Sequence, residues 1–135
     1  MPKRNRDHRS PAHFRVMREI LGISVSDLAN TLDVNPRSVR DWCLSTTAPT
    51  AAWDIIDKRA KWVTSTLTTV LDELADQPDP DEVDLSVFAT DQPARLAGLD
   101  MPAHEHRACV GVLALCLMAE GYNVEINYVP HDTAP

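Results

Sequence analysis

Two arginines in the first third of the chain, Arg37 and Arg40, stand three residues apart, close to Asn35 and Asp41. A guanidinium group can donate two hydrogen bonds to the O6 and N7 acceptors of guanine, an asparagine amide is suited to adenine, and a carboxylate can accept a hydrogen bond from N4 of cytosine. These side chains can therefore contact the edges of DNA bases, provided that one rigid element presents them on the same side.

The stretch from residue 25 to residue 44 predicts such an element, because it contains two short helical patterns that meet at a break near residues 33–35. Its apolar residues follow helical spacing on both sides of the break: Leu28, Ala29 and Leu32, then Val39 and Trp42. Ser24 and Asp27 have the spacing of a capping box at the start of the first helix. Asn35, with a proline after it, is a typical start for the second helix.

Two short helices joined by a tight turn can hold the second one at the angle that enters the DNA major groove. The joint needs a small residue where the helices cross, an apolar residue after the turn and further apolar residues in the second helix. The chain supplies all of these packing residues: Ala29, Val34, Val39 and Trp42. The spacing indicates a helix-turn-helix, although an ordinary helical hairpin of an all-α domain is the alternative.

On these residues, positions 13–59 resemble the lambda-repressor-like, or Xre-type, DNA-binding domain. The resemblance implies an opening helix, a positioning helix and a recognition helix, followed by one or two more helices. The chain departs from the family pattern at Asp33, where the family often has glycine, and at Cys43, where an acidic residue is common.

The predicted DNA contacts follow from a helical wheel on which Val39, Trp42 and Cys43 turn inward. Arg37 and Arg40 are expected to contact bases, and a solvated surface role is the alternative for each. Asn35 is expected to bind adenine or a phosphate, and Asp41 to orient Arg37 or to accept a hydrogen bond from cytosine. The full predicted set is Ser26, Asn35, Arg37, Ser38, Arg40 and Asp41. Ser24 and Ser26 are both placed to contact a phosphate, and the resemblance favours Ser26. Weaker phosphate candidates are Arg15, Arg18, Thr46 and Thr47.

Charge divides the chain into a basic part and an acidic part. Residues 1–62 contain 11 Lys and Arg against 7 Asp and Glu, whereas residues 63–135 contain 2 against 13. Although the net charge is −7, this asymmetry indicates that the N-terminal part alone binds a polyanion. The first eleven residues are expected to form a flexible arm, either solvated or in contact with DNA, with four basic residues: Lys3, Arg4, Arg6 and Arg9.

The second half of the chain predicts a long helix and then a small α/β region. Apolar residues at heptad spacing run from Trp53 to Leu74, which favours a partner helix in the same chain or in a second subunit. The stretches that begin at Val83 and at Val124 alternate like strands, and residues 102–120 between them form a strongly apolar helix. Two strands cannot cover such a helix, so a homodimer with a shared sheet is expected.

The expected fold is therefore mainly α: a lambda-repressor-like helix-turn-helix bundle, a long connecting helix, and a strand-helix-strand dimerisation region. The expected divisions are an arm at 1–11, a DNA-binding domain at 12–62 whose last helix continues to 75, a linker at 76–82, the dimerisation region at 83–130 and a tail at 131–135.

Other chemistry finds little support in the sequence. His104, His106, Cys109 and Cys116 lack the paired spacing of a structural zinc site, so no metal is expected. No phosphate-binding glycine loop or nucleophile motif is present, so we expect neither an enzyme nor a cofactor. An odd number of cysteines, no recognisable signal peptide and a longest apolar run of 12 residues favour a cytoplasmic protein without a membrane span.

These features together predict a sequence-specific DNA-binding regulator, a homodimeric repressor on an inverted-repeat operator, with double-stranded DNA and a second copy of the chain as partners. Two alternatives stay open. One is an antitoxin that binds a toxin through its acidic half and regulates its own gene. The other is a protein-interaction module whose helix-turn-helix does not bind DNA.

Overall fold

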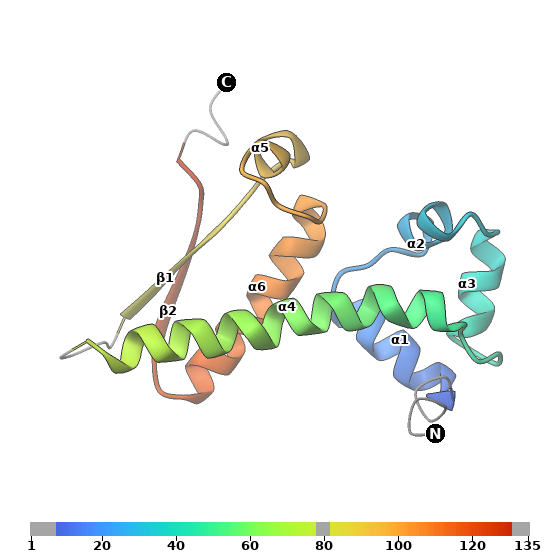
Figure 1. Cartoon of the computed structure of the whole chain (residues 1–135), viewed down its shortest axis with the longest axis horizontal. Coiled ribbons are helices and arrows are strands. Elements are labelled where there is room, and N and C mark those ends of the chain that lie inside the picture. The colour runs from blue at the N-terminus through green and yellow to red at the C-terminus, as the bar shows by residue number, and fades with distance from the viewer. Residues whose placement is uncertain (1–7, 78–81, 131–135) are drawn as a thin grey trace. The chain divides into compact units, whose positions relative to one another are not determined.

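The computed structural model describes residues 8–77 and 82–130. They form six helices and two strands (Figure 1), in the order α1 (Pro11–Ile20), α2 (Val25–Leu32), α3 (Pro36–Trp42), α4 (Thr50–Ala75), β1 (Glu82–Val87), α5 (Asp91–Leu96), α6 (Ala103–Ala119) and β2 (Asn123–Tyr128). The predicted mainly helical fold with a small sheet is confirmed. The backbone divides into two compact units, residues 1–60 and 61–135, and α4 begins in the first unit and ends in the second.

The core of unit 1 forms around an aromatic group from three helices. The ring of Phe14 in α1 lies edge-on to Trp42 of α3 and to Trp53 of α4, with centroids 6.1 and 5.4 Å apart. Leu28 and Ala29 of α2 are buried in the same unit. Because aromatic side chains bury large areas, these contacts hold the short helices α1 to α3 in place although none of them is long enough to be stable alone.

The helix starts in unit 1 are set by local hydrogen bonds. The Ser10 hydroxyl accepts from the N–H of His13 at 3.1 Å, and Pro11 occupies the first turn of α1. The Ser24 hydroxyl accepts from the N–H of Asp27 at 3.0 Å, so this half of the predicted capping box is confirmed. Each cap satisfies an N–H group that has no partner inside its helix.

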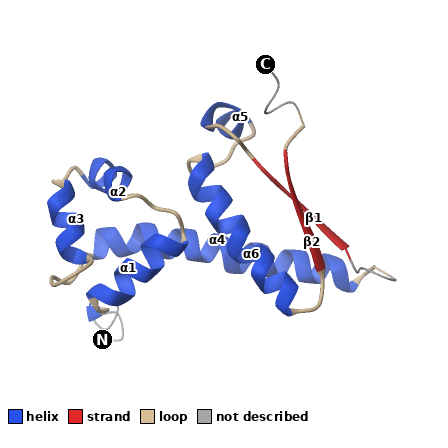
Figure 2. Ribbon diagram, turned by 180° about the vertical axis from the view of Figure 1, so that it is seen from behind, coloured by secondary structure: helices blue, strands red, loops and turns tan. Residues whose placement is uncertain are grey.

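Unit 2 contains a two-stranded parallel sheet (Figure 2), in which Val83 lies opposite Val124 and Val87 opposite Tyr128. The apolar residues of both strands share one face, and α6 packs against both strands. Parallel pairing requires the chain to cross from the end of β1 to the start of β2, and α5 and α6 make that crossing.

The core of unit 2 joins the sheet to α6 and to the second half of α4. Its buried residues are Leu74, Val83, Leu113 and Leu117, and Leu67 and Val70 of α4 pack against them. The C-terminal part of the predicted heptad pattern is thus covered by this chain itself. None of the helices formed by the described residues is long and apolar enough to cross a membrane.

The two strands of unit 2 pair with each other, so a single chain forms the two-stranded sheet. The helix α5 was not predicted, because it is only six residues long and contains Pro93. Tertiary contacts stabilise α5, because its Ala94 is fully buried. The Asp91 carboxylate also accepts a hydrogen bond from the N–H of Ala103 at 2.7 Å, which caps the start of α6.

Candidate nucleic-acid interface

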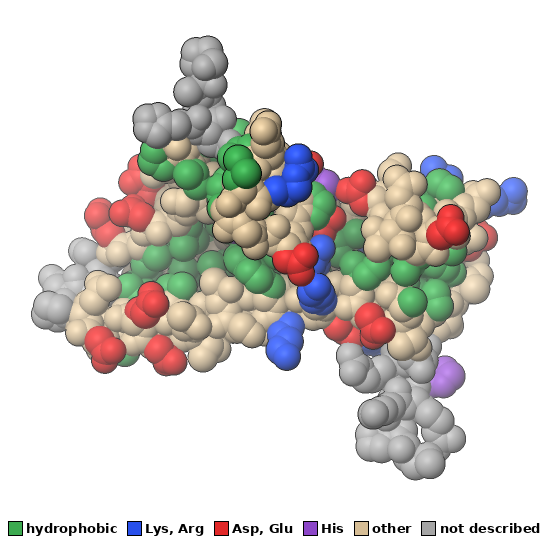
Figure 3. Space-filling view, turned by 45° about the horizontal axis from the view of Figure 1, so that its top comes forward, with side chains coloured by type: hydrophobic (Ala, Val, Ile, Leu, Met, Phe, Trp, Pro, Cys, Tyr) green, Lys and Arg blue, Asp and Glu red, His purple; other side chains and the backbone are tan. Residues whose placement is uncertain are grey.

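The helix α3 has one buried side and one exposed side. Val39 and Trp42 point into the core of unit 1, whereas Arg37, Arg40, Asp41 and Leu44 are exposed and Ser38 is half-buried between the two sides. We call the exposed set Arg37, Arg40, Asp41 and Leu44 the α3 outer face. Figure 3 shows Lys and Arg side chains at the surface of the end of unit 1 that α3 occupies.

The buried side of α3 fixes the direction of the outer face. Val39 is fully buried, and Trp42 meets the Phe14 ring at an interplanar angle of 88°. Truncating a buried tryptophan typically costs about 3–5 kcal/mol. A rotation of α3 that turned Arg37 away from solvent would break these contacts, so the core determines which side chains face outward.

The turn between α2 and α3 has the geometry that such a short joint requires. Asp33 adopts φ 54° and ψ 49°, in the left-handed region, where glycine is strain-free. The N–H of Val34 then donates to the carbonyl of Ala29 at 3.0 Å, which closes the end of α2. The departure of Asp33 from glycine therefore leaves the turn conformation intact.

Asn35 has a structural task at the start of α3. Its Oδ1 accepts from the N–H of Arg37 at 2.8 Å, the predicted cap of this helix. A two-point contact with adenine would require the same oxygen. Because an amide oxygen can accept two hydrogen bonds, Asn35 can position Arg37 and still make the predicted adenine contact.

The start of α2 presents Ser26 to solvent in the first turn of the helix. Its hydroxyl and the adjoining backbone N–H groups are suited to a phosphate oxygen. Ser24, the neighbouring candidate, is half-buried and its oxygen is occupied by the cap to Asp27. Thr46 and Thr47 are exposed after α3.

Two of the weaker phosphate candidates have partners within unit 1. The Arg18 guanidinium donates to the carbonyl of Ile23 at 2.9 Å, so it fastens the α1–α2 connection and is unsuited to a phosphate contact. Arg15 lies on the surface and forms an ion pair with Glu19 at 3.4 Å, one turn along α1.

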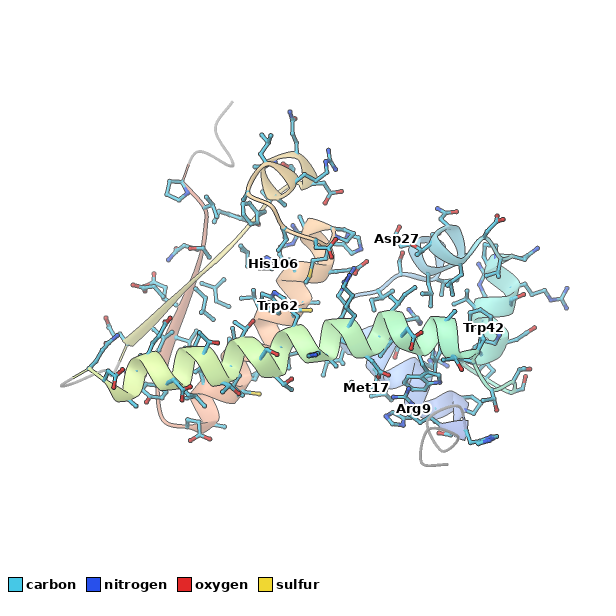
Figure 4. The ribbon with its side chains drawn as sticks, viewed as in Figure 1. Arg9, Met17, Asp27, Trp42, Trp62 and His106 are labelled. Atoms are coloured by element: carbon cyan, nitrogen blue, oxygen red, sulfur yellow. The ribbon has the colours of Figure 1, made fainter. Side chains whose placement is uncertain are left out.

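The predicted flexible arm must be shortened, because Arg9 is part of the folded unit. Its guanidinium forms an ion pair with Asp57 of α4 and stacks on the ring of Trp53. Figure 4 labels Arg9 beside the start of α1. Lys3, Arg4 and Arg6 lie outside the described residues. From the sequence, Arg9 is assigned to the arm because its partner, the Asp57 carboxylate, is 48 residues away. A pair so far apart leaves no local sequence pattern.

The histidine and cysteine cluster of α6 lies in unit 2. His106 and Cys109 are buried, and Figure 4 labels His106 close to Trp62. The His106 ring centroid lies 5.3 Å from that of Trp62 and 5.8 Å from that of Phe88. Burial lowers the pKa of His106 below its usual value of 6.5, and the charge of Arg107 adds to that effect. This aromatic setting favours a neutral imidazole that belongs to the core.

Comparison with known proteins adds no relative: no family model matches the chain, and no curated protein matches it either.

Proposed function

We propose that this chain is a sequence-specific DNA-binding transcriptional repressor that acts as a homodimer. The observation that carries the proposal is the α3 outer face, on which Arg37 and Arg40 are exposed while Val39 and Trp42 lock the opposite side. A short helix with a fixed inner side and arginines outside is suited to the major groove, where arginine is the best match for guanine.

The proposal includes a lambda-repressor-like arrangement of α1 to α4, with α2 as the positioning helix and α3 as the recognition helix. The tight end of α2 at Asp33 and the burial of Ala29 support this arrangement, because both bring the two helices close together. Ser26 at the start of α2 then contacts a phosphate and sets the depth at which α3 enters the groove.

In this proposal, unit 2 forms the contact with the second subunit. Large apolar side chains are exposed on α6 and β2: Leu115, Met118, Ile126 and Tyr128. Hydrophobic side chains reach the surface of this unit between the sheet and α4 (Figure 3). A second copy that covers them would give the assembly two α3 helices, and a two-fold protein of this kind binds two half-sites about one helical turn of DNA apart. The acidic charge of residues 63–135 would keep unit 2 away from the phosphates.

The proposed action needs no catalysis and no cofactor. The dimer occupies an inverted-repeat operator and excludes polymerase or an activator from the same DNA. Each two-point arginine–guanine contact typically supplies about 1–3 kcal/mol of discrimination against other bases.

The test is selection of bound sequences from a random DNA library with the wild-type chain and with an Arg37→Ala, Arg40→Ala double variant. We expect the wild type to enrich an inverted repeat, and the double variant to lose it while it keeps its fold and its oligomeric state. Arg95→Ala is the control for lost charge, because Arg95 is exposed on α5 in unit 2. An Arg95→Ala variant that loses the motif equally, or a wild type without a motif, would overturn the proposal.

The antitoxin is the second candidate, because unit 2 carries both exposed apolar side chains and most of the acidic residues of the chain. Such a surface suits a basic protein partner as well as a second copy. The oligomeric state separates the two: a repressor dimerises by itself, whereas an antitoxin whose apolar surface is the toxin site stays monomeric without its partner.

A further inference from the structure

Leu44 is the large apolar side chain of unit 1 that is most exposed in the described residues, at 69%. A single exposed leucine is ordinary on a protein surface and needs no explanation by itself. The position of this one is informative, because it belongs to the same face as the two arginines of α3.

Leu44 continues the line of the α3 outer face beyond the end of the helix. Its N–H donates to the carbonyl of Asp41 at 3.1 Å, so the chain still follows a helical turn there. Arg37, Asp41 and Leu44 are separated by steps of four and three residues, which places them in one row along the helix. The seven residues from Arg37 to Leu44 rise by about 10 Å along the helix axis, so the two side chains reach different base pairs.

This inference rests on the proposed function: we propose that Leu44 contacts the C5 methyl group of a thymine in each half-site, at a different base pair from the one that Arg37 contacts. The leucine side chain has no hydrogen-bond donor or acceptor, so it cannot bind a phosphate or a polar base edge. Thymine is the base that presents a methyl group in the major groove, and apolar side chains recognise it there.

The inference gives Leu44 a role in specificity that the arginines cannot fill. Arg37 and Arg40 select guanine, whereas an apolar group next to a cytosine amine or an adenine amine would leave that donor without a partner. The α3 outer face would thus select a half-site in which a guanine and a thymine stand at a fixed separation.

The experiment uses the operator selected by the wild-type chain and replaces one thymine at a time by deoxyuridine, which lacks only the C5 methyl group. We expect the wild type to bind about three- to fivefold more weakly at one position of each half-site, the effect of one buried methyl group. Leu44→Ala should bind the thymine operator more weakly by about the same factor. The affinity of Leu44→Ala should not fall further when deoxyuridine replaces that thymine.

Val16→Ala is the matched control, because Val16 is 59% exposed on α1 and lies outside the α3 outer face. It should respond to deoxyuridine as the wild type does. The inference is overturned if no deoxyuridine substitution lowers the affinity of the wild-type chain for the operator. This outcome is measured on the wild type alone. It is also overturned if deoxyuridine lowers the affinity of Leu44→Ala by the same factor as that of the wild type. A wild type that selects no operator fails at the earlier step and overturns the proposed function as well.

Discussion

Arg9 and Asp57 form a two-point ion pair across 48 residues of sequence, with Nη1 and Nη2 donating to Oδ1 and Oδ2 at 2.9 and 3.1 Å. The same guanidinium lies 3.5 Å from the centre of the Trp53 ring. The residue before the N-cap of α1 is thereby attached to α4. A contact of this kind closes unit 1 around its aromatic core, and it removes Arg9 from any arm that reaches toward DNA.

Replacing Arg9 by alanine should lower the free energy of unfolding by about 1–2 kcal/mol, because a partly buried ion pair and a cation–π contact are lost together. A double-mutant cycle with Asp57→Ala, measured by urea denaturation, should give a coupling of about 1 kcal/mol. Arg15→Ala is the control: its ion pair with Glu19 is exposed and should contribute less than about 0.5 kcal/mol. Equal losses for Arg9→Ala and Arg15→Ala would contradict the contact.

Replacing Asp33 by glycine should stabilise unit 1 by about 0.5–1 kcal/mol, because the left-handed conformation at this residue strains an L side chain. Thermal unfolding should show the gain as an increase in Tm of about 2–8 °C. Asp33→Ala should give no gain, since alanine keeps the Cβ atom. A higher Tm for the alanine variant than for the glycine variant would show that the strain is not at this residue.

Two leucines of α6 should separate folding from self-association. Leu117 is fully buried in the core of unit 2, whereas Leu115 on the same helix is 64% exposed. Leu117→Ala should cost about 2–5 kcal/mol of stability, because it leaves a cavity. Leu115→Ala should change stability by less than about 0.5 kcal/mol.

A charge introduced at Leu115 should weaken the proposed dimer. Leu115→Glu should shift the chain from dimer to monomer in sedimentation experiments, because it buries a carboxylate in the proposed interface. Its helix content should stay that of the wild type. A Leu115→Glu variant that is still fully dimeric would place the interface elsewhere, for example at the exposed Ile126 and Tyr128 of β2.

Stability should fall in mildly acidic solution because of His106, which is 7% exposed. Burial, and after it the charge of Arg107, lowers the pKa of this imidazole in the folded chain below the usual 6.5. The unfolded chain therefore binds a proton first as the pH falls below 6.5, and the folded chain does so only at lower pH. The contribution of His106 is complete above that value and is lost as the pH falls toward the lowered pKa.

The variant His106→Phe isolates this effect, because phenylalanine suits the contacts with Trp62 and Phe88 and does not titrate. Urea denaturation at several pH values should show that the wild type loses stability relative to His106→Phe below about pH 6.5. Parallel curves for the wild type and His106→Phe would contradict a buried neutral imidazole.

Local chemistry explains why much of unit 1 could be predicted from the sequence. Ser24 and Asn35 cap their helices through the N–H groups of Asp27 and Arg37, two or three residues along the chain. The spacing of Val39 and Trp42 likewise determines which side of α3 is buried, and hence that Arg37 and Arg40 are exposed. Such signals lie within one or two helical turns, so no knowledge of distant residues is needed.

The sequence by itself therefore determined the helix starts, the strand periodicity and the exposed side of α3. Only the tertiary structure decided that Arg9 pairs with Asp57, that β1 pairs in parallel with β2 of the same chain, and that α5 forms. Each of these depends on groups far apart in sequence, or on a buried position such as that of Ala94, that exists only once the chain is packed. Local propensity is too weak to specify them, because the stabilising contacts come from the assembled core.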